Sequence, residues 1–549
     1  MRVLKFFLPV ACATLVSIPA SAQVANLLAG YQQARSGLTA EPMKCGFAAQ
    51  TELRNAPGLE VELRKSMLAR PVLPQAYVTP DKRFRIHYTT SGVDAVAATS
   101  TNSEGVPDFV YEAGKAAQRA YALLVDSLGM KAHAPDGGVD GSEFDFYIIN
   151  LGSLYGETRF EFSGGSGPAY IVIDNNYGPE FYSQGLNGLR VTVAHEYFHA
   201  VQLNYFLRNE DIFFFEISSV WFEDVAYDAV NDYFAYLRRW FRDTELPLTT
   251  RNGSHEYGSG LWLHYITQKI KSRTIVRDFW ERIVQEPAML AMKNRLQAAP
   301  YELPFGLAVS EFYTWCFFTG ARALPEFYFA EGEDYPSVEF AVSQQLTQNL
   351  TLTDDVEPLA AKYYRLIRVA QDLQGNLQIA EDPGRFSLTS ISRDDDGEYS
   401  SQTGFGQFPV VVAAKARQDT VVFVAVNGSL PQTSSGGNSY NLQLTLGPQL
   451  GLENMLESPY PNPFRPPRDS FLRVPYSIKK AAVVEAIILA EDGRVMWRTK
   501  SSQNVPVGLH EIVWNGRDET EQLVASGVYI LRFIAGDFAA STKIVVIRR

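Results

Sequence analysis

The chain has 549 residues, of which 46% are hydrophobic and 13% aromatic, enough apolar side chains for packed cores. This composition excludes an intrinsically disordered or fibrous protein. The formal net charge of −12 disfavours non-specific binding to nucleic acid or to an anionic membrane surface.

The N-terminus has the pattern of a secretory signal peptide over residues 1–22. Arg2 and Lys5 precede an apolar run that ends in Ala20-Ser21-Ala22, and we expect cleavage before Gln23. No later apolar stretch reaches the roughly 18 residues that a membrane-spanning helix needs. The sequence therefore predicts an exported protein, secreted or on the cell surface, whose mature chain has no transmembrane segment.

Four further segments follow along the chain. Residues 23–80 are helix-prone and then irregular, which indicates a leader or propeptide rather than a core. Residues 81–340 mix strand-like and helical patterns and are predicted to form one α+β domain. Residues 350–448 contain alternating apolar runs separated by Gly, Ser, Asn and Asp, which predicts a β-sandwich domain. Short strands with turns recur over residues 458–549.

The mature chain keeps two cysteines, Cys45 and Cys316. One disulfide between them is possible, but they can form neither a disulfide framework nor a zinc ribbon. We therefore expect any metal to be held by histidines and carboxylates.

An HExxH motif spans His195 to His199 in a stretch that should be helical. The spacing of four residues places both imidazoles on one helix face, where they can bind a single Zn²⁺ ion. Glu196 lies about 100° further round the helix, where it can act on a metal-bound water as general base. Chance is the alternative, but it would produce this motif in roughly one such chain in a hundred or fewer.

A catalytic zinc ion also needs a third protein ligand and an open position. Residues 211–233 lack Gly and Pro and begin with Asp211, a plausible N-cap, so we expect one helix there. Glu216 lies in the apolar run FFFEI, where metal ligation would offset the cost of desolvating its carboxylate. Glu223 lies two turns further on the same face. We favour Glu216 as ligand and Glu223 as the group that orients a ligating histidine; Glu223 or Asp224 as ligand, or neither, are the alternatives.

These motifs resemble those of the gluzincin metallopeptidases. HEYFHAVQ followed by EISSVW is similar to their HExxH helix and their E-G-[ST]-A-x-W type second helix, although Ile217 replaces the usual glycine. More narrowly, residues 84–320 resemble a group of secreted bacterial metallopeptidases in the segments RFRIHY, EGVPDFV, RVTVAHEYFHAVQ, EISSVWFEDVAYDAVNDY and FYTWCFFTGAR. The resemblance implies a zincin-like fold, a zinc ion and a protein or peptide substrate.

The resemblance extends to two further parts of the site. HEYGSGLW is similar to the Y-x-x-G segment by which aminopeptidase-like gluzincins place a phenol near zinc, so Tyr257 is a candidate oxyanion donor and His255 the second choice. A packed aromatic ring is the alternative for Tyr257. The family fold also implies that AYIVIDN (169–175) could be the edge strand along which a substrate lies, with a core strand as the alternative.

Two other features have both a functional interpretation and a purely structural one. The Asp-rich segments 102–108 and 135–145 could hold Ca²⁺, or they could be ordinary turns. Cys45, within PMKCGFA, faintly resembles the cysteine switch by which some metalloprotease propeptides block their zinc with a thiolate. A disulfide to Cys316 or an idle thiol are the alternatives.

Residues 458–549 include SPYPNPF, DGRV and a terminal KIVVIRR. They resemble the C-terminal sorting domain of proteins exported by the bacterial type IX secretion system and the related Ig-like fold of flagellar hook-capping proteins. This resemblance implies that the bacterial secretion machinery is a partner and that the protein reaches the cell surface or the medium.

The fold expected is α+β, with a zincin-like metallopeptidase domain, a β-sandwich domain and a C-terminal Ig-like β-sandwich. The function expected is a secreted zinc metallopeptidase, a hydrolase that acts on protein or peptide and does not bind nucleic acid. One rival is a non-catalytic surface adhesin with a structural or vestigial metal site. Another is a hydrolase with a different substrate, because zinc and a general base do not fix the substrate.

Overall fold

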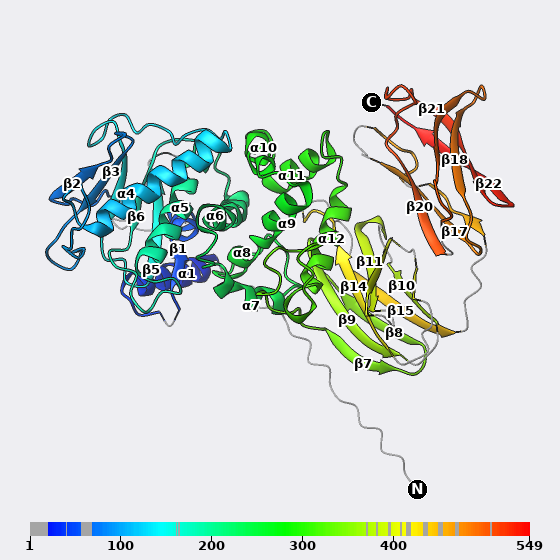
Figure 1. Ribbon diagram of the computed structural model, residues 1–549, viewed down its shortest axis with the longest axis horizontal. Coiled ribbons are helices and arrows are strands. Elements are labelled where there is room, and N and C mark those ends of the chain that lie inside the picture. The colour runs from blue at the N-terminus through cyan, green and yellow to red at the C-terminus, as the bar shows by residue number, and fades with distance from the viewer. Residues whose placement is uncertain are drawn as a thin grey trace, which may run out of the picture. The chain divides into compact units, whose positions relative to one another are not determined.

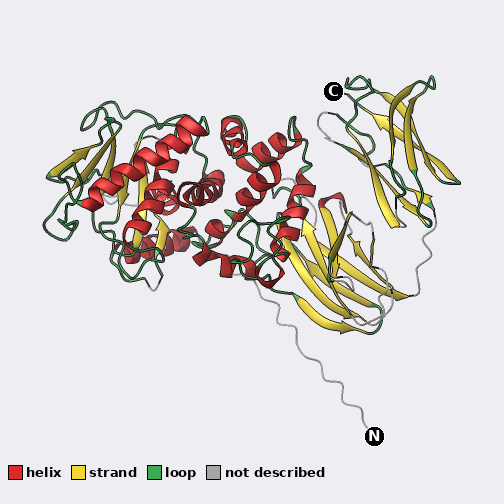
Figure 2. Cartoon of the chain, viewed as in Figure 1, coloured by secondary structure: helices red, strands yellow, loops and turns green. Residues whose placement is uncertain are grey.

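The computed structural model describes residues 20–39, 41–55, 69–160, 162, 165–368, 372–379, 383–393, 397–406, 409–412, 419–431, 438–447, 454–459, 461–466, 471–505 and 508–548. All but the last three residues of the expected signal peptide lie outside these ranges. The chain divides into two compact units, residues 1–215 with 222–232, and residues 216–221 with 233–549. No helix in the described ranges is both long and apolar enough to cross a bilayer. Figure 2 shows that helices and strands are mixed, as an α+β fold requires.

The first unit is built on a six-stranded mixed sheet with the order β1-β5-β6-β4-β3-β2. Its strands, in that order, are Met43–Cys45 (β1), Leu154–Phe160 (β5), Ala169–Ile173 (β6), Phe144–Ile148 (β4), Phe84–Tyr88 (β3) and Gln75–Val78 (β2). Figure 1 labels β1, β2, β3, β5 and β6 of this sheet. Every residue of β4, β5 and β6 is buried, because these strands lie inside the sheet. β4 and β6 are largely apolar and aromatic, whereas β5 also buries the ion pair of Glu157 and Arg159.

The position of β6 corrects one expectation. The segment AYIVIDN could have been the edge strand for a substrate, but β6 pairs with β5 on one side and with β4 on the other. Both sides of its backbone are therefore occupied. The short strand β1 lies at this edge of the sheet and pairs with β5. The sequence did not indicate that β5 would be the strand next to the edge.

Helices surround this sheet, and α4 and α5 pack on it and on each other (Figure 1). The helices of the first unit are Ala20–Arg35 (α1), Phe47–Asn55 (α2), Asp108–Tyr121 (α4), the π-helix Ala122–Ser127 (η1), Gly185–Gln202 (α5), the 3₁₀ turn Asn209–Asp211 (η2) and Ile212–Tyr227 (α6). The predicted helix over residues 211–233 thus ends earlier than expected. Asn231 adopts a left-handed conformation with φ of 52°, which an asparagine tolerates and which a helix does not allow.

The leader, residues 23–80, was expected to lie outside the core, and this expectation was wrong. Tyr31 and Ala34 of α1 and Ala49 and Leu53 of α2 are buried in an apolar cluster with residues of β4, β5 and β6. The leader also supplies β1 and β2 to the sheet. Its apolar residues are few, so their pattern is weak in the sequence, but they are the ones that face the sheet.

The second unit begins with helices and continues with strands. Its helices are Phe234–Arg242 (α7), His255–Gly258 (α8), Leu261–Ile270 (α9), Thr274–Ile283 (α10), Ala288–Gln297 (α11), Phe305–Phe317 (α12) and the 3₁₀ turns Gly320–Arg322 (η3) and Pro383–Arg385 (η4). Aromatic side chains fill the space between them, for example Trp240 against Phe312 and Trp262 against Phe312.

Two sheets then enclose one apolar cluster in the manner of a sandwich. The first has the order β13-β10-β15-β8, and the second has the order β12-β11-β14-β9-β7. Their strands are Val342–Leu346 (β7), Leu350–Asp355 (β8), Ala360–Arg368 (β9), Asp372–Gln378 (β10), Phe386–Arg393 (β11), Tyr399–Phe405 (β12), Val410–Val412 (β13), Asp419–Asn427 (β14) and Ser439–Gly447 (β15). The first strand begins ahead of the predicted boundary at residue 350.

The last part of the chain has a separate apolar cluster between two sheets, β16-β17-β20 and β19-β18-β21-β22. The strands are Met455–Leu456 (β16), Leu472–Ile478 (β17), Val484–Ala490 (β18), Val495–Lys500 (β19), Gly508–Trp514 (β20), Gly527–Ala535 (β21) and Phe538–Val546 (β22). The domain boundaries predicted from the sequence stay predictions.

Candidate metal centre

Helix α5 brings the two histidines of the HExxH motif together in the interior of the first unit. His195 is 1% exposed and His199 is fully buried, and their Nε2 atoms lie 3.1 Å apart. Two nitrogens bound at about 2.0–2.1 Å to one tetrahedral ion would be about 3.3 Å apart. The imidazoles therefore already have the spacing that a shared ion requires.

Glu216 and Cys45 belong to the same group. One ligand atom from each of Cys45, His195, His199 and Glu216 lies within 4.8 Å of the others, and all four residues are buried. Their donor atoms are two imidazole nitrogens, a carboxylate oxygen and a sulfur, the ligand types that zinc and related transition metals bind. The group could therefore hold a metal ion.

Helix α6 fixes the place of Glu216. Residues 216–221 are grouped with the second unit, but both ends of this continuous helix belong to the first unit. Before Glu216, the Phe215 carbonyl accepts a hydrogen bond from Gln202 Nε2 at 3.2 Å. After it, Phe222 packs against Phe198 of α5 with ring centroids 5.3 Å apart. Glu216 is thus held between two contacts that α6 makes with α5.

Each histidine is also oriented through its second ring nitrogen. His195 Nδ1 lies 2.6 Å from Glu223 Oε1, and His199 Nδ1 lies 2.8 Å from Gln202 Oε1. An Nδ1–H that donates to an oxygen leaves Nε2 unprotonated and turned toward the metal. The sequence suggested this role for Glu223. It missed Gln202, although a glutamine three residues after His199 lies on the same side of the helix.

Glu223 is part of a buried charge network. Its Oε2 accepts a hydrogen bond from Lys44 Nζ at 2.7 Å, and Lys44 also contacts Asp232 at 2.5 Å. Burial alone would lower the pKa of Lys44, but Asp232 and Glu223 raise it above its ordinary value. Burial likewise opposes ionisation of Asp232, and Lys44 holds the pKa of that carboxyl below its usual range. The three groups therefore form a charged triad beside the histidines.

Glu196 lies where helix α5 crosses β5. Its Oε2 accepts a hydrogen bond from Thr158 at 2.7 Å, while its buried Oε1 has no hydrogen-bond partner of ordinary geometry among the described residues. Burial raises the pKa of Glu196, against the opposing effects of His195 and His199. A buried carboxylate oxygen without a donor is costly, and the Cys45 thiol is one group that can donate to Glu196 here.

The close approach of α5 to β5 depends on Gly156. A Cβ atom at this position would lie 2.6 Å from Thr192 Cγ2 and 3.1 Å from Glu196 Cγ. Only glycine therefore lets the helix that carries the HExxH motif come this near to the strand.

The expectation that histidines and carboxylates alone would hold a metal omitted Cys45. The thiol Sγ lies 3.4 Å from His199 Nε2, and neither Cys45 nor Cys316 is part of a disulfide. The suggested disulfide between Cys45 and Cys316 is therefore not formed. Cys45 lies too far from the HExxH motif in the sequence for their spacing to suggest a shared site. Only the resemblance of PMKCGFA to a cysteine switch indicated that Cys45 could lie near the metal.

The two candidate oxyanion donors lie on α8, in the second unit. The ring of Tyr257 is buried and packs against Tyr236 with centroids 4.9 Å apart. His255 stacks near Trp240, and its buried Nε2 has no hydrogen-bond partner. Burial lowers the pKa of His255 to about 4. Their catalytic roles stay predictions.

Protein groups already bond to both candidate calcium segments. Asp108 accepts hydrogen bonds from Thr101 and Asn102, which closes a turn at the start of α4. Asp145 pairs with Arg70 at 2.6 Å and with His87 at 2.9 Å. His87, Asp140 and Asp145 lie close enough to share an ion, but Arg70 supplies the positive charge there. Ordinary turns and ion pairs within the protein account for these contacts without a calcium ion.

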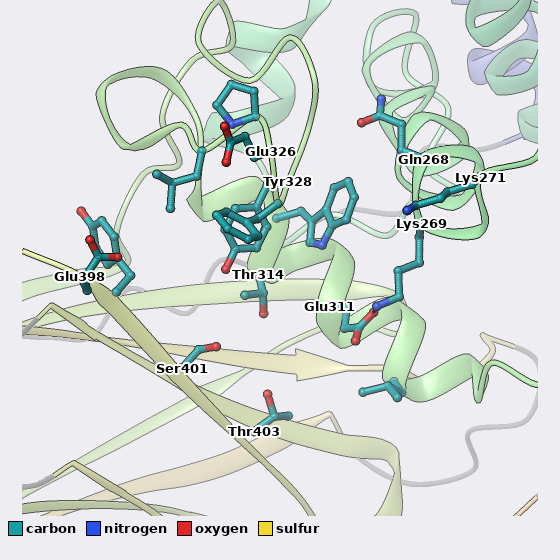
Figure 3. A pocket seen from close by; sticks show the side chains of 16 residues that line it. Gln268, Lys269, Lys271, Glu311, Thr314, Glu326, Tyr328, Glu398, Ser401 and Thr403 are labelled. Atoms are coloured by element: carbon teal, nitrogen blue, oxygen red, sulfur yellow. Dashed lines mark ion pairs between the residues drawn. The ribbon is translucent and has the colours of Figure 1, made fainter.

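A separate pocket, which no sequence pattern indicated, lies within the second unit (Figure 3). Helices α9 and α12 and strand β12 contribute to its lining, which includes Trp315, Tyr328 and Tyr399. Lys269 and Glu311 form an ion pair of 2.8 Å there.

Comparison with known proteins identifies no family. No family model matches the chain, and no curated protein matches it. Among solved structures, PorZ of the type IX secretion system of Porphyromonas gingivalis is 17% identical, over 29% of this chain and 22% of PorZ, with a TM-score of 0.15. Latent PorU from the same organism is 13% identical, over 38% of this chain and 19% of PorU, with a TM-score of 0.17.

A β-glucuronidase from Ruminococcus gnavus is 14% identical over 32% of this chain and 36% of its own, with a TM-score of 0.11. The matched parts thus cover well under two thirds of each of these proteins. Similarity at this level does not identify an activity, so the function has to be inferred from the site.

Proposed function

We propose that this protein is a secreted zinc-dependent metallopeptidase with a zincin-like catalytic domain. His195, His199 and Glu216 would hold the ion, and Glu196 would be the general base. The observation that carries the proposal is that buried ligand atoms of His195, His199 and Glu216 lie within 4.8 Å of one another, with Glu196 on the helix that carries both histidines.

Each group of the proposed site would have its own role in peptide hydrolysis. A bound Zn²⁺ ion would polarise the scissile carbonyl and lower the pKa of a water molecule. Glu196 would accept the proton of that water at Oε1 while the water oxygen attacks the carbonyl carbon. It would then pass the proton to the leaving amine. Thr158 fixes Oε2 of the same carboxylate, so that Oε1 is the oxygen left for proton transfer.

The surrounding residues would position this machinery. Glu223 and Gln202 keep Nε2 of each histidine available for the metal. Tyr257, with His255 as the second choice, is proposed as the donor that stabilises the oxyanion of the transition state.

A structural metal site in a surface adhesin is the second candidate, and one observation favours it. Counting Cys45, the group offers four protein ligands, the number typical of closed structural zinc sites. A catalytic site must instead open one position to the substrate.

The test separates these candidates. Zinc content and hydrolysis of an unfolded protein such as casein are measured on the full-length chain and again after the leader has been cut off. The peptidase proposal expects one zinc per chain for wild type and for Glu196→Gln, with hydrolysis only by wild type. Glu281→Gln, at an exposed carboxylate on α10, is the matched control and should behave as wild type. Zinc in the full-length wild type, with no hydrolysis before or after the cut, would support the structural site.

We also propose that residues 458–549 are a sorting domain for the type IX secretion system. Support comes from the sequence resemblance and from the separate apolar core of these residues. The domain fused to a reporter should bring the reporter to the surface of a bacterium that has this system. Export that persists in a strain without the system would contradict the proposal.

A further inference from the structure

We propose that Cys45 is the fourth ligand of the metal and that the part of the leader up to α2, which carries Cys45, keeps the enzyme latent until the chain is cut after α2. This inference rests on the proposed function. It adds a cysteine to the proposed ligands His195, His199 and Glu216, and it makes the leader an inhibitor of the enzyme.

The distances fit a thiolate ligand. Cys45 Sγ lies 3.4 Å from His199 Nε2. A sulfur at about 2.3 Å and a nitrogen at about 2.0–2.1 Å from one tetrahedral ion would be about 3.6 Å apart. Cys45 also belongs to the buried group with His195 and Glu216. It therefore takes the position that a catalytic zinc ion leaves to water and substrate.

The backbone around Cys45 occupies the edge of the sheet beside this position. Strand β1 pairs in parallel with β5, with Cys45 opposite Gly156. The ladder extends on both sides, because Met43 N donates to Ser153 O at 2.8 Å and Gly46 N donates to Gly156 O at 2.9 Å. Extended peptides commonly bind proteins by adding a strand to such an edge. The leader thus blocks both the metal and the nearest strand on which a substrate could lie.

The residues on either side of Cys45 fasten it to the site. Lys44 bonds to Glu223, the residue that orients His195. The ring of Phe47 stacks on His199 with centroids 4.5 Å apart and an interplanar angle of 22°. Both side chains are at most 2% exposed. The segment 44–47 is therefore complementary to the metal site, which an idle thiol would not require.

The helices of the leader hold this segment from the other side. Tyr31 OH and Gln50 Nε2 each donate to Glu157 Oε2 at 2.5 Å. Arg54 bonds to the Phe160 carbonyl at the end of β5. These contacts are buried or partly buried and do not depend on a covalent link between cysteines. Hydrolysis of one peptide bond after α2 would let the leader dissociate, the thiolate take up a proton and the fourth position open.

The test uses the full-length chain loaded with Co²⁺ in place of zinc. A thiolate bound to Co²⁺ gives a charge-transfer absorption band in the near ultraviolet, which imidazole and carboxylate ligands do not give. The band should be present in wild type and in Cys316→Ser, which removes the other buried cysteine. It should be absent from Cys45→Ser, with one Co²⁺ still bound. Absence from wild type, or persistence in Cys45→Ser, would overturn the ligation.

A second measurement needs no cysteine variant. The recognition sequence of a specific protease is placed between residues 60 and 65 of the full chain, and the chain is cut. Cutting and removal of the leader should abolish the cobalt band and raise casein hydrolysis by the zinc form at least tenfold. Full activity before the cut would overturn latency while the peptidase function stands. No hydrolysis after loss of the band would overturn both latency and the peptidase function.

Discussion

Nδ1 of His195 lies 2.6 Å from Oε1 of Glu223, and the other oxygen of the same carboxylate accepts a hydrogen bond from Lys44 at 2.7 Å. One carboxylate therefore links a proposed metal ligand on α5 to the leader. The leader and the metal site are coupled through this residue, in addition to the proposed sulfur ligand beside it.

The two glutamates of α6 should differ in their effect on zinc. Glu223→Gln removes the charge that orients His195, and such changes weaken metal affinity by about 10- to 100-fold. Glu216→Gln replaces a proposed ligand and should weaken zinc binding by more. The dissociation constant of zinc, measured by competition with a chelator, checks the order. The reverse order would contradict the choice of Glu216 as ligand.

Removing the hydroxyl of Thr158 should slow hydrolysis without loss of zinc. In Thr158→Val, Oε2 of the buried Glu196 loses its donor, at a cost of about 1–3 kcal/mol. The carboxylate is then no longer fixed, so we expect kcat of the leader-free enzyme to fall while the zinc content stays at one per chain. Thr158→Ser keeps the hydroxyl and should restore most of the rate. An equal loss in both variants would show that the hydroxyl is not the cause.

Adding a methyl group to Gly46 should loosen the leader. A Cβ atom there would lie 2.7 Å from Glu157 Oε2 and 2.8 Å from Glu157 Cβ. Gly46→Ala should destabilise the docked leader by about 1–3 kcal/mol, and the uncut chain should then hydrolyse casein faster than wild type. Gly30→Ala is the control, because no atom lies within 4 Å of its Cβ position. If the two variants have the same unfolding midpoint and activity, the tight fit at Gly46 has no effect.

Stability should fall in mild acid because of His255. Burial lowers its folded-state pKa from 6.5 to about 4. Between these values the unfolded chain binds a proton that the folded chain does not, so stability decreases as the pH falls from 6.5 toward 4. Complete loss of this contribution amounts to about 3 kcal/mol.

Denaturant unfolding at pH 7 and at pH 4.5 measures this effect. Wild type should lose more stability between these two conditions than His255→Gln, which cannot take up the proton. An equal loss in the two proteins would contradict the assignment.

The sequence predicted the parts of the site that depend on local periodicity. His195 and His199 are one helical turn apart on α5, and their spacing alone placed both rings on one side. Glu223 was expected to orient a histidine, and it lies within hydrogen-bond distance of His195. Such relationships follow from the geometry of a single helix or of two neighbouring helices.

The parts that local periodicity could not place depend on pairing between distant segments. Cys45 reaches His199 because β1 joins the edge of a sheet whose strands come from residues 75 to 173. No local pattern encodes which strand lies at that edge, and AYIVIDN was therefore a candidate for it. The end of α6 was missed for a different reason. The helix ends at Tyr227, and the left-handed backbone of Asn231 excludes a helix that continues to residue 233, without a glycine or proline to mark the place.

A crystal structure of the zinc-loaded, full-length chain, with anomalous diffraction measured at the zinc absorption edge, tests the central claim most directly. We expect one anomalous peak at about 2.0–2.1 Å from Nε2 of His195 and of His199 and at about 2.0–2.2 Å from a Glu216 oxygen, with Cys45 Sγ at about 2.3 Å. A chain that binds no zinc under these conditions, or a peak elsewhere in the molecule with these side chains turned apart, would contradict the account.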